Sequence, residues 1–377
     1  MHMNGRERYL NVLTYKPVDR IPLEPGGPRR STLRRWHAEG LPEGADFYRH
    51  IMDLLNIRME YPAKQVDHGV NTRMIPIFEE KVLSHENGHY IVQDWMGAIT
   101  EISDEFDYTY IRNAIDFVTR KWHKFPVETR EDWQEMKKRY DPNEPSRLPA
   151  NADSLKSAME VRDYLTRFSA NGPFWQLREW MGFENLCMAF IERPDFVNEM
   201  IEFWCDYILR LFELAAEKFP IDCFYISEDM AFKAHSMISP AMTREFILPT
   251  YKKWVAAGKR HGVQLFDMDS DGFIEELIPI WIEAGINVCD PIEVAAHNDI
   301  VRFKELFGKD IAYRGGVDKR KIAAGGTEME SEVRRVVEPF LASGGLIPSC
   351  DHGVPHDISF ENFVAYTKLL AQLTGWL

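Results

Sequence analysis

The stretch that decides the fold covers residues 263–272 and reads Val-Gln-Leu-Phe-Asp-Met-Asp-Ser-Asp-Gly. It begins as an apolar run and ends in carboxylates at every second position, followed by glycine. Because a strand turns its side chains to alternate faces, we expect Asp267, Asp269 and Asp271 on one side of an extended chain. A helical pattern follows from Phe273. Strand, acidic end and helix in this order are typical of α/β enzymes, which place their chemistry at the carboxyl ends of strands. The alternative is that the aspartates only cap the helix or face solvent.

The same alternation of strand and helix continues on both sides of this stretch. Strands are predicted near 164–168, 222–227, 263–267, 286–289, 310–314 and 345–349. Helices are predicted near 194–218, 240–261, 272–284, 299–307, 327–343 and 359–375. Short strands near 21–23 and 55–60 bring the total to eight. Alternating strands and helices with short links require a parallel sheet, and eight such units predict an α/β fold of the (β/α)8 TIM-barrel class.

The residues ahead of these units predict two additions to the barrel. A helical extension is expected within residues 4–20. The runs at 79–84 and 90–95 flank Asn87-Gly88, which is typical of a hairpin turn, so we expect an antiparallel β-hairpin insertion over 76–104. The chain has no linker rich in Gly, Ser or Pro and no glycine motif for nucleotide binding. We therefore predict a single domain over 1–377.

Composition excludes several classes of function. A net charge of −14 disfavours binding to nucleic acid or to an anionic membrane surface. No run of 18 apolar residues and no export signal are present, which predicts a soluble protein. The five cysteines are odd in number and form no Cys-x-x-Cys pair, which favours the reducing cytoplasm.

Polar residues directly follow the predicted strands. They are Glu228 and Asp229, the acidic end at 267–271, Asp290, Arg314, and the group Cys350, Asp351 and His352. Because the carboxyl ends of barrel strands meet on one face, we interpret this ring as an active site.

Three chemical interpretations of the ring remain open. Asp269, Asp271 and Cys350, or His352 in place of the thiol, supply the ligand types that catalytic zinc uses. Glu228 or Asp229 has the features of a general acid, since like charges resist joint ionisation. Arg314 is a candidate clamp for an anionic group of a substrate, or the partner of a neighbouring carboxylate.

Aromatic residues near the same strands are candidates for the wall of a pocket. Trp175 follows the strand at 164–168, and Tyr225 lies within the strand at 222–227. We predict that both contact substrate, although most tryptophans in such a chain serve packing.

Several motifs resemble those of a known family. They are Arg6-Glu7-Arg8-Tyr9-Leu10, Lys16-Pro17-Val18-Asp19-Arg20-Ile21-Pro22, Arg314-Gly315-Gly316-Val317-Asp318 and His352-Gly353-Val354-Pro355, in this order. Together they resemble the uroporphyrinogen decarboxylase superfamily, which includes cobalamin-dependent methyltransferases. The resemblance implies a barrel with its site at the carboxyl face.

Two departures from the family patterns narrow this expectation. The decarboxylases hold a porphyrinogen with an Arg-rich segment and with a Phe-Ser-Asp motif. Both are absent from this chain, which has Arg29-Arg30 near the place of the Arg-rich segment. The thiol-activating methyltransferases bind zinc through His-x-Cys-Gly, where this chain has Asp269-x-Asp271-Gly272. Carboxylates at these positions suit the departure of an oxygen or nitrogen leaving group better than activation of a thiol.

The resemblance therefore implies a methyltransferase that moves a methyl group from a small donor, such as a methoxylated aromatic compound, to a corrinoid (cobalamin) held by a partner protein. Such an O-demethylase would use Glu228, Asp229, Asp271 and His352 for catalysis, with Arg314, Trp175 and Tyr225 binding substrate. Zinc at Asp269, Asp271 and Cys350 and a homodimer belong to the same expectation. The alternatives are decarboxylation of a porphyrinogen or smaller polycarboxylate, and non-catalytic tetrapyrrole or corrinoid binding.

Overall fold

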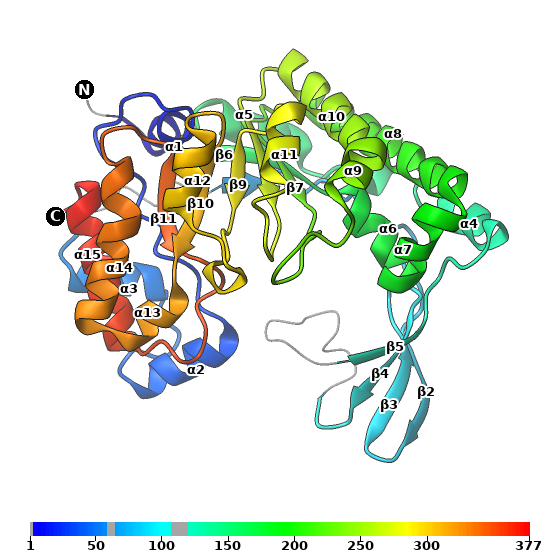
Figure 1. Ribbon diagram of the computed structural model, residues 1–377, viewed down its shortest axis with the longest axis horizontal. Helices are drawn as coiled ribbons and strands as arrows, with labels where there is room; N and C mark the ends of the chain where they lie inside the picture. The colour runs from blue at the N-terminus through cyan, green and yellow to red at the C-terminus, as the bar shows by residue number, and fades with distance from the viewer. Residues whose placement is uncertain (1–2, 59–64, 107–119) are drawn as a thin grey trace. The chain divides into compact units, whose positions relative to one another are not determined.

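The computed structural model describes residues 3–58, 65–106 and 120–377. The chain divides into two compact units (Figure 1). The first comprises Met1–His68, Asn151–Ala170 and Ala216–Leu377, and the second comprises Gly69–Ala150 and Asn171–Ala215. The single domain over 1–377 stays a prediction.

The first unit is built on a parallel sheet of seven strands among the described residues. In spatial order they are β1 (Gln65–Asp67), β6 (Leu165–Asn171), β7 (Cys223–Ser227), β8 (Leu265–Asp269), β9 (Val288–Asp290), β10 (Ala312–Val317) and β11 (Leu346–Cys350). The six strands predicted between 164 and 349 are confirmed, and the parallel sheet is consistent with a TIM-like barrel.

The two strands predicted early in the chain are not found as expected. Residues 21–23 form no strand, and the strand near 55–60 is replaced by β1 at Gln65–Asp67, with residues 59–64 outside the described part of the chain. Two residues beyond the first of these segments, the Pro25 carbonyl accepts the Cys350 N–H at 3.2 Å, so this segment lies beside the end of β11 without regular pairing.

Helices follow the strands as the alternation predicts (Figure 1). Those of the first unit are α1 (Gly5–Leu13), α2 (Arg30–Ala38), α3 (Phe47–Leu54), α5 (Ala152–Glu160), α9 (Pro240–Met242), α10 (Leu248–Arg260), α11 (Ile278–Ala284), α12 (Ile300–Phe307), α13 (Lys319–Ala324), α14 (Gly326–Val337) and α15 (Phe360–Thr374). The helix predicted at 272–284 begins only at Ile278, because Gly272 has a φ of +83° and Phe273 donates to the Phe232 carbonyl, which holds a turn there. None of the described helices has both the length and the apolar character that crossing a membrane requires.

The second unit carries the predicted hairpin. Strands β2 (Lys81–Glu86) and β3 (His89–Gln93) flank the Asn87-Gly88 turn, and β4 (Ile99–Ser103) and β5 (Arg120–Lys124) complete an antiparallel sheet. The helices of this unit are α4 (Arg130–Lys137), α6 (Pro173–Met181), α7 (Phe183–Glu192) and most of α8 (Pro194–Lys218). The hairpin insertion is confirmed.

An apolar layer closes the amino end of the parallel sheet. It takes one residue from each of six strands and packs against the α1 residues Tyr9, Leu10, Val12 and Leu13. The strand residues are Leu165, Cys223, Leu265, Val288, Ala312 and Ile347. Burying these side chains is the main stabilising contribution at this end, and it fixes which face of every strand points inward.

Candidate active site

A polar layer lies directly above the apolar layer. Because strand side chains alternate, the residues two positions further along each strand share its inward face. They are Arg167, Tyr225, Asp267, Asp290, Arg314 and Ser349. The inward-facing side chains thus change from apolar to mostly ionisable over two residues along each strand. Charged groups are therefore placed next to the apolar layer, where water is scarce.

Arg314 is the centre of the polar layer. Its Nη1 donates to Asp267 Oδ2 at 2.9 Å and to Asp290 Oδ2 at 3.0 Å, and its Nη2 lies 3.9 Å from Glu24 Oε2. Burial raises the pKa of all three carboxyl groups, and Arg314 opposes this rise. A single guanidinium therefore faces several acids, so Arg314 is the partner of neighbouring carboxylates, and its binding of an anionic substrate group stays a prediction.

A cavity of about 890 Å³ opens above this cluster. Of the residues predicted for the site, Asp229, Asp269, Asp271, Arg314, Cys350 and His352 line it. The sequence therefore identified most of the polar wall, and these residues converge from β7, β8, β10 and β11. The volume lies in the range that small-molecule sites occupy.

Asp269 is an acid of this wall with a strongly raised pKa. Burial and the neighbouring Asp229 raise the pKa of Asp269 to about 7, and Asp271 and Asp267 add to the rise. Ser227 Oγ donates to its Oδ2 at 3.2 Å. At neutral pH a large fraction of Asp269 therefore holds a proton at the wall of the cavity, as a general acid requires.

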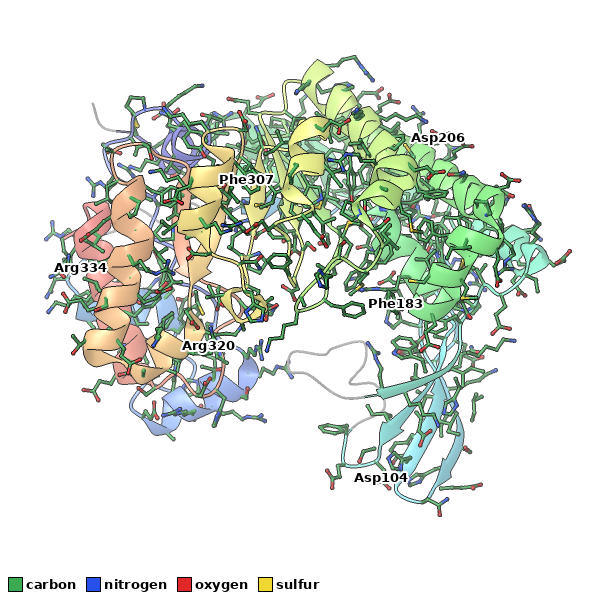
Figure 2. The ribbon with its side chains drawn as sticks, in the orientation of Figure 1. Asp104, Phe183, Asp206, Phe307, Arg320 and Arg334 are labelled. Carbon is green, nitrogen blue, oxygen red and sulfur yellow. The ribbon has the colours of Figure 1, made fainter. Side chains whose placement is uncertain are left out.

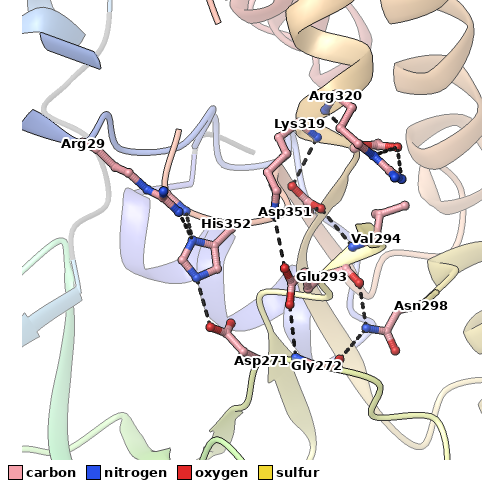
Figure 3. A network of polar contacts seen from close by, with 12 residues as sticks. Arg29, Asp271, Gly272, Glu293, Val294, Asn298, Lys319, Arg320, Asp351 and His352 are labelled. Carbon is pink, nitrogen blue, oxygen red and sulfur yellow. Dashed lines mark hydrogen bonds and ion pairs between the residues drawn. The ribbon is translucent and has the colours of Figure 1, made fainter. Parts of the chain in front are cut away.

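His352 and Asp271 form a second polar pair on the wall (Figure 3). His352 Nδ1 accepts the Gly353 N–H at 2.8 Å and lies 3.2 Å from Arg29 Nη2. The other ring nitrogen therefore carries hydrogen and donates to Asp271 Oδ2 at 3.1 Å. The hydrogen bond to Asp271 raises the pKa of His352. The Asp271 N–H in turn donates to Asp229 Oδ1 at 2.9 Å, which links the ends of β7, β8 and β11.

A network behind this pair holds the loops in place (Figure 3). The Asn298 amide nitrogen donates to the Gly272 carbonyl at 2.8 Å and to the Glu293 carbonyl at 2.9 Å. The Glu293 carboxylate accepts the Gly272 N–H at 3.3 Å and pairs with Lys319 at 3.4 Å. Lys319 lies 3.7 Å from Asp351, which is fully buried. The turn that presents Asp271 is thus tied to the loops after β9, β10 and β11.

The other predicted residues lie elsewhere. Glu228 is fully buried and does not line the cavity, because it follows the inward-facing Ser227 and its side chain takes the opposite face; it accepts a hydrogen bond from the Tyr251 hydroxyl at 2.5 Å. Tyr225 lies in the polar layer, with the Arg167 guanidinium 4.6 Å from its ring centre. Trp175 belongs to α6 in the second unit, where its indole donates to Glu179 at 2.8 Å.

The zinc set expected at Asp269, Asp271 and Cys350 is not assembled. Among the described residues, no three His, Cys, Asp or Glu side chains come together as metal ligands. Burial and the Asp351 charge raise the pKa of the Cys350 thiol to about 12, so this thiol holds its proton at neutral pH in the structure. Asp271 is held by His352 instead. These residues do not fit zinc.

Sequence reasoning missed the part of the site that comes from the start of the chain. Tyr9, Glu24 and Gln65 line the cavity, with the Gln65 amide donating to the Tyr9 hydroxyl at 3.1 Å and that hydroxyl lying 3.4 Å from Glu24. Arg167 was also missed, although its place two residues after the buried Leu165 gives the signal.

Comparisons with known proteins agree with this fold. A methyltransferase from Methanosarcina mazei superposes with a TM-score of 0.56 over 98% of this chain and 99% of that chain, at 12% sequence identity, which establishes likeness of fold alone. A structure described as a vitamin-B12-independent methionine synthase from Listeria monocytogenes gives a TM-score of 0.33 over 59% of this chain and 66% of that chain, at 11% identity, a score too low to establish likeness of fold. No curated protein matches the chain.

The family model for uroporphyrinogen decarboxylase (URO-D) matches residues 115–373. This range contains β6 to β11 and all the acids of the cavity that those strands supply. Since the match spans more than half of the chain, this protein belongs to the uroporphyrinogen decarboxylase (URO-D) family.

Proposed function

We propose that this protein is a cytoplasmic methyltransferase that moves a methyl group from a small donor, such as a methoxylated aromatic compound, to a corrinoid carried by a partner protein. The observation that carries the proposal is Asp269, an acid with a pKa of about 7 on the wall of a cavity sized for a small molecule. The family match and the likeness of fold to a methyltransferase support it.

The proposal includes a closed (β/α)8 barrel. The segment ending at Pro25 would fill the eighth position beside β11, since the Cys350 N–H donates to the Pro25 carbonyl. In such a barrel the cavity lies at the carboxyl face, where a partner protein can dock over the mouth.

The residues of this chain would bind the donor and assist the leaving atom. When the methyl group is transferred, the bond between its carbon and the ether oxygen breaks, and the electron pair of that bond stays on the oxygen. Asp269 would donate its proton to this oxygen, so that the donor leaves as a neutral hydroxyl compound rather than as an anion, which is a poorer leaving group. Burial, together with the charges of Asp229 and Asp271, keeps that proton on Asp269 until the transfer, because all three disfavour its ionisation. The corrinoid would supply the nucleophile that accepts the methyl group.

The charge of the cavity favours this proposal over decarboxylation of a polycarboxylate. Its described lining carries the acids Glu24, Asp46, Asp53, Asp229, Asp269 and Asp271 against the guanidinium groups of Arg49, Arg167 and Arg314. An excess of acids repels a substrate with several carboxylates. The family match alone keeps decarboxylation as the second candidate, and release of carbon dioxide without corrinoid would identify it.

The test is methyl transfer with the purified protein. Mixing it with a reduced corrinoid protein and a panel of methoxyaromatic compounds should produce the absorbance of a methyl–cobalt bond. Replacing Asp269 by Asn removes the proton but keeps the size, so the rate should fall by about 10²-fold or more. Asp310→Asn, an exposed aspartate ahead of β10, is the matched control and should keep the rate. Absence of any absorbance change across the panel contradicts the proposal.

A further inference from the structure

Arg167 is a cation on the wall of the cavity that the proposed proton transfer does not use. Other arginines of the first unit serve its outer surface: Arg334 of α14 is exposed and pairs with Glu330 at 3.0 Å (Figure 2). Arg167 instead lies on the inward face of β6 and lines the cavity, with 30% of its side-chain surface exposed. A guanidinium that faces a cavity is placed to meet a ligand.

The contacts of Arg167 fix its orientation and leave part of its hydrogen-bonding capacity unused. The guanidinium lies 4.6 Å from the centre of the Tyr225 ring, and its Nη1 donates to Gln65 Oε1 at 3.2 Å. Within the described part of the chain, Nε is buried without a hydrogen-bond partner, and Nη2 has no partner but is not buried. The side chain is therefore held on a ring and an amide, with the N–H groups of Nη2 accessible from the cavity.

No described carboxylate binds Arg167 as closely as Asp267 and Asp290 bind Arg314. Those two acids accept hydrogen bonds from Arg314 at 2.9 and 3.0 Å. Their charges also act on Arg167, which lowers the pKa of both. The nearest ion-pair partner of Arg167 among the described residues is Asp67, whose Oδ2 lies 3.7 Å from Nε, beyond hydrogen-bond distance. Of these two cations, Arg167 is the one that a ligand carboxylate can still bind directly.

Tyr225 connects this guanidinium to Asp269. The face of its ring carries Arg167, and its hydroxyl group forms a hydrogen bond with Asp269. Asp269 lies two residues beyond Asp267 on β8, so it is farther from the apolar layer than the residues of the polar layer are. The cation and the proton donor are therefore no farther apart than the contacts of one tyrosine side chain allow. A substituted benzene ring can bridge such a distance.

We propose that Arg167 binds the carboxylate of a methyl donor that carries one such group, while the ether oxygen of the donor lies at Asp269. The identity of the ligand as a methyl donor rests on the proposed methyl transfer. The planar guanidinium matches a carboxylate with two N–H···O bonds, which a neutral group does not replace at equal strength. The excess of acids in the lining favours a single negative charge over a phosphate or a polycarboxylate. Arg167 thus sets both the class of the donor and its orientation.

Ligand binding to the full chain tests this assignment without any corrinoid. In isothermal titration calorimetry, para-methoxybenzoate should have a dissociation constant about tenfold or more below that of para-methoxybenzamide, its neutral analogue of similar shape. Arg167→Gln should remove this preference and leave the affinity for the amide unchanged. Arg334→Gln makes the same change at the outer surface, so it is the matched control and should keep the preference.

A second variant covers the case in which Arg167→Gln does not fold, which loss of amide binding would reveal. Arg167→Lys keeps the charge but lacks the planar fork, so it should bind para-methoxybenzoate more weakly than the wild type does and the amide equally well. The proposal is overturned if the wild type binds the carboxylate no better than the amide, or if the preference survives both changes. Failure of methyl transfer is a distinct result, because it appears only in the methyl–cobalt absorbance.

Discussion

Asp269 depends on its acidic neighbours for its proton, and they contribute unequally. Burial is the first cause of its raised pKa, Asp229 is the first of the charges, and Asp271 and Asp267 follow. The hydrogen bond of the Tyr225 hydroxyl opposes them by lowering the pKa. The charge that raises the pKa of Asp269 most is thus that of Asp229, which follows the neighbouring strand β7.

Replacing Asp229 by Asn tests this assignment. Asn keeps a side-chain oxygen for the Asp271 N–H, bound at 2.9 Å in the wild type, while it removes the charge. The pKa of Asp269 should then fall, and the rate of methyl transfer should begin its decline at a pH about one unit lower. The pH–rate profile of kcat/KM measures this. Asp271→Asn should shift the profile less, and an equal or larger shift contradicts the order of the causes.

At the same scale, alternation along a strand explains the success and the failure of sequence reasoning. The two-residue repeat of a strand correctly predicted that Asp267 and Asp269 share one face, and this face points inward because Leu265 on it packs in the apolar layer. The same period, applied to β7, turns Glu228 away from the cavity once Tyr225 and Ser227 face inward. The choice of face becomes certain only when the packing partners of a strand are known.

Among the elements, strands β6 to β11 and the helices after them were predictable, whereas β1 and the turns were not. The predicted helix at 194–218 has the bounds of α8, because its apolar face repeats without interruption. The turn at 270–277 delays α11, since hydrogen bonds to residues on other loops hold it open. Contacts between loops far apart in the sequence leave no periodic signal.

Gly272 is the position where this turn is most sensitive. A Cβ there would lie 2.3 Å from the Ala231 carbonyl oxygen, and its φ is +83°. Gly272→Ala should therefore lower the free energy of unfolding by about 1–3 kcal/mol or displace the turn, with loss of the Asp271 position and of activity. Gly262→Ala is the control: it has a similar φ of +80° and open space around its Cβ. Thermal unfolding and kcat, measured for both variants, separate the effect of the steric clash with Ala231 from that of backbone strain. If Gly272→Ala and Gly262→Ala lose equal stability and activity, the clash is not the cause.

For the whole molecule, the way in which the start of the chain completes the site could not be predicted from sequence. Tyr9, Glu24 and Gln65 reach the cavity from α1, the segment beside β11, and β1. Their spacing carries no motif, because only the closure of the tertiary structure brings them to Arg314. The proton of Asp269 likewise follows from burial, which a linear pattern does not contain.

This burial predicts how the stability of the protein depends on pH. In the folded state Asp269 has a pKa of about 7, against 3.8 for an ordinary aspartate. Between these values the folded state binds more protons than the unfolded state, so the contribution of Asp269 to stability falls as pH rises, by up to about 1.4 kcal/mol per pH unit. Asp269→Asn should flatten the decline of the unfolding temperature from pH 5 to pH 7 in calorimetry. An unchanged slope would contradict the shifted pKa.

The division of the chain into two units has a consequence for how the protein can be cut. The first unit is made of three separate segments and the second of two, so the backbone passes between them after His68, Ala150, Ala170 and Ala215. Neither unit can be expressed as one uninterrupted fragment. A protease nick at any single peptide bond leaves at least one unit shared by both pieces, so the fragments should stay together until denaturant separates them. The design of gene fusions and truncations of this chain must take account of all four points at which the backbone crosses between the units, rather than of one domain boundary.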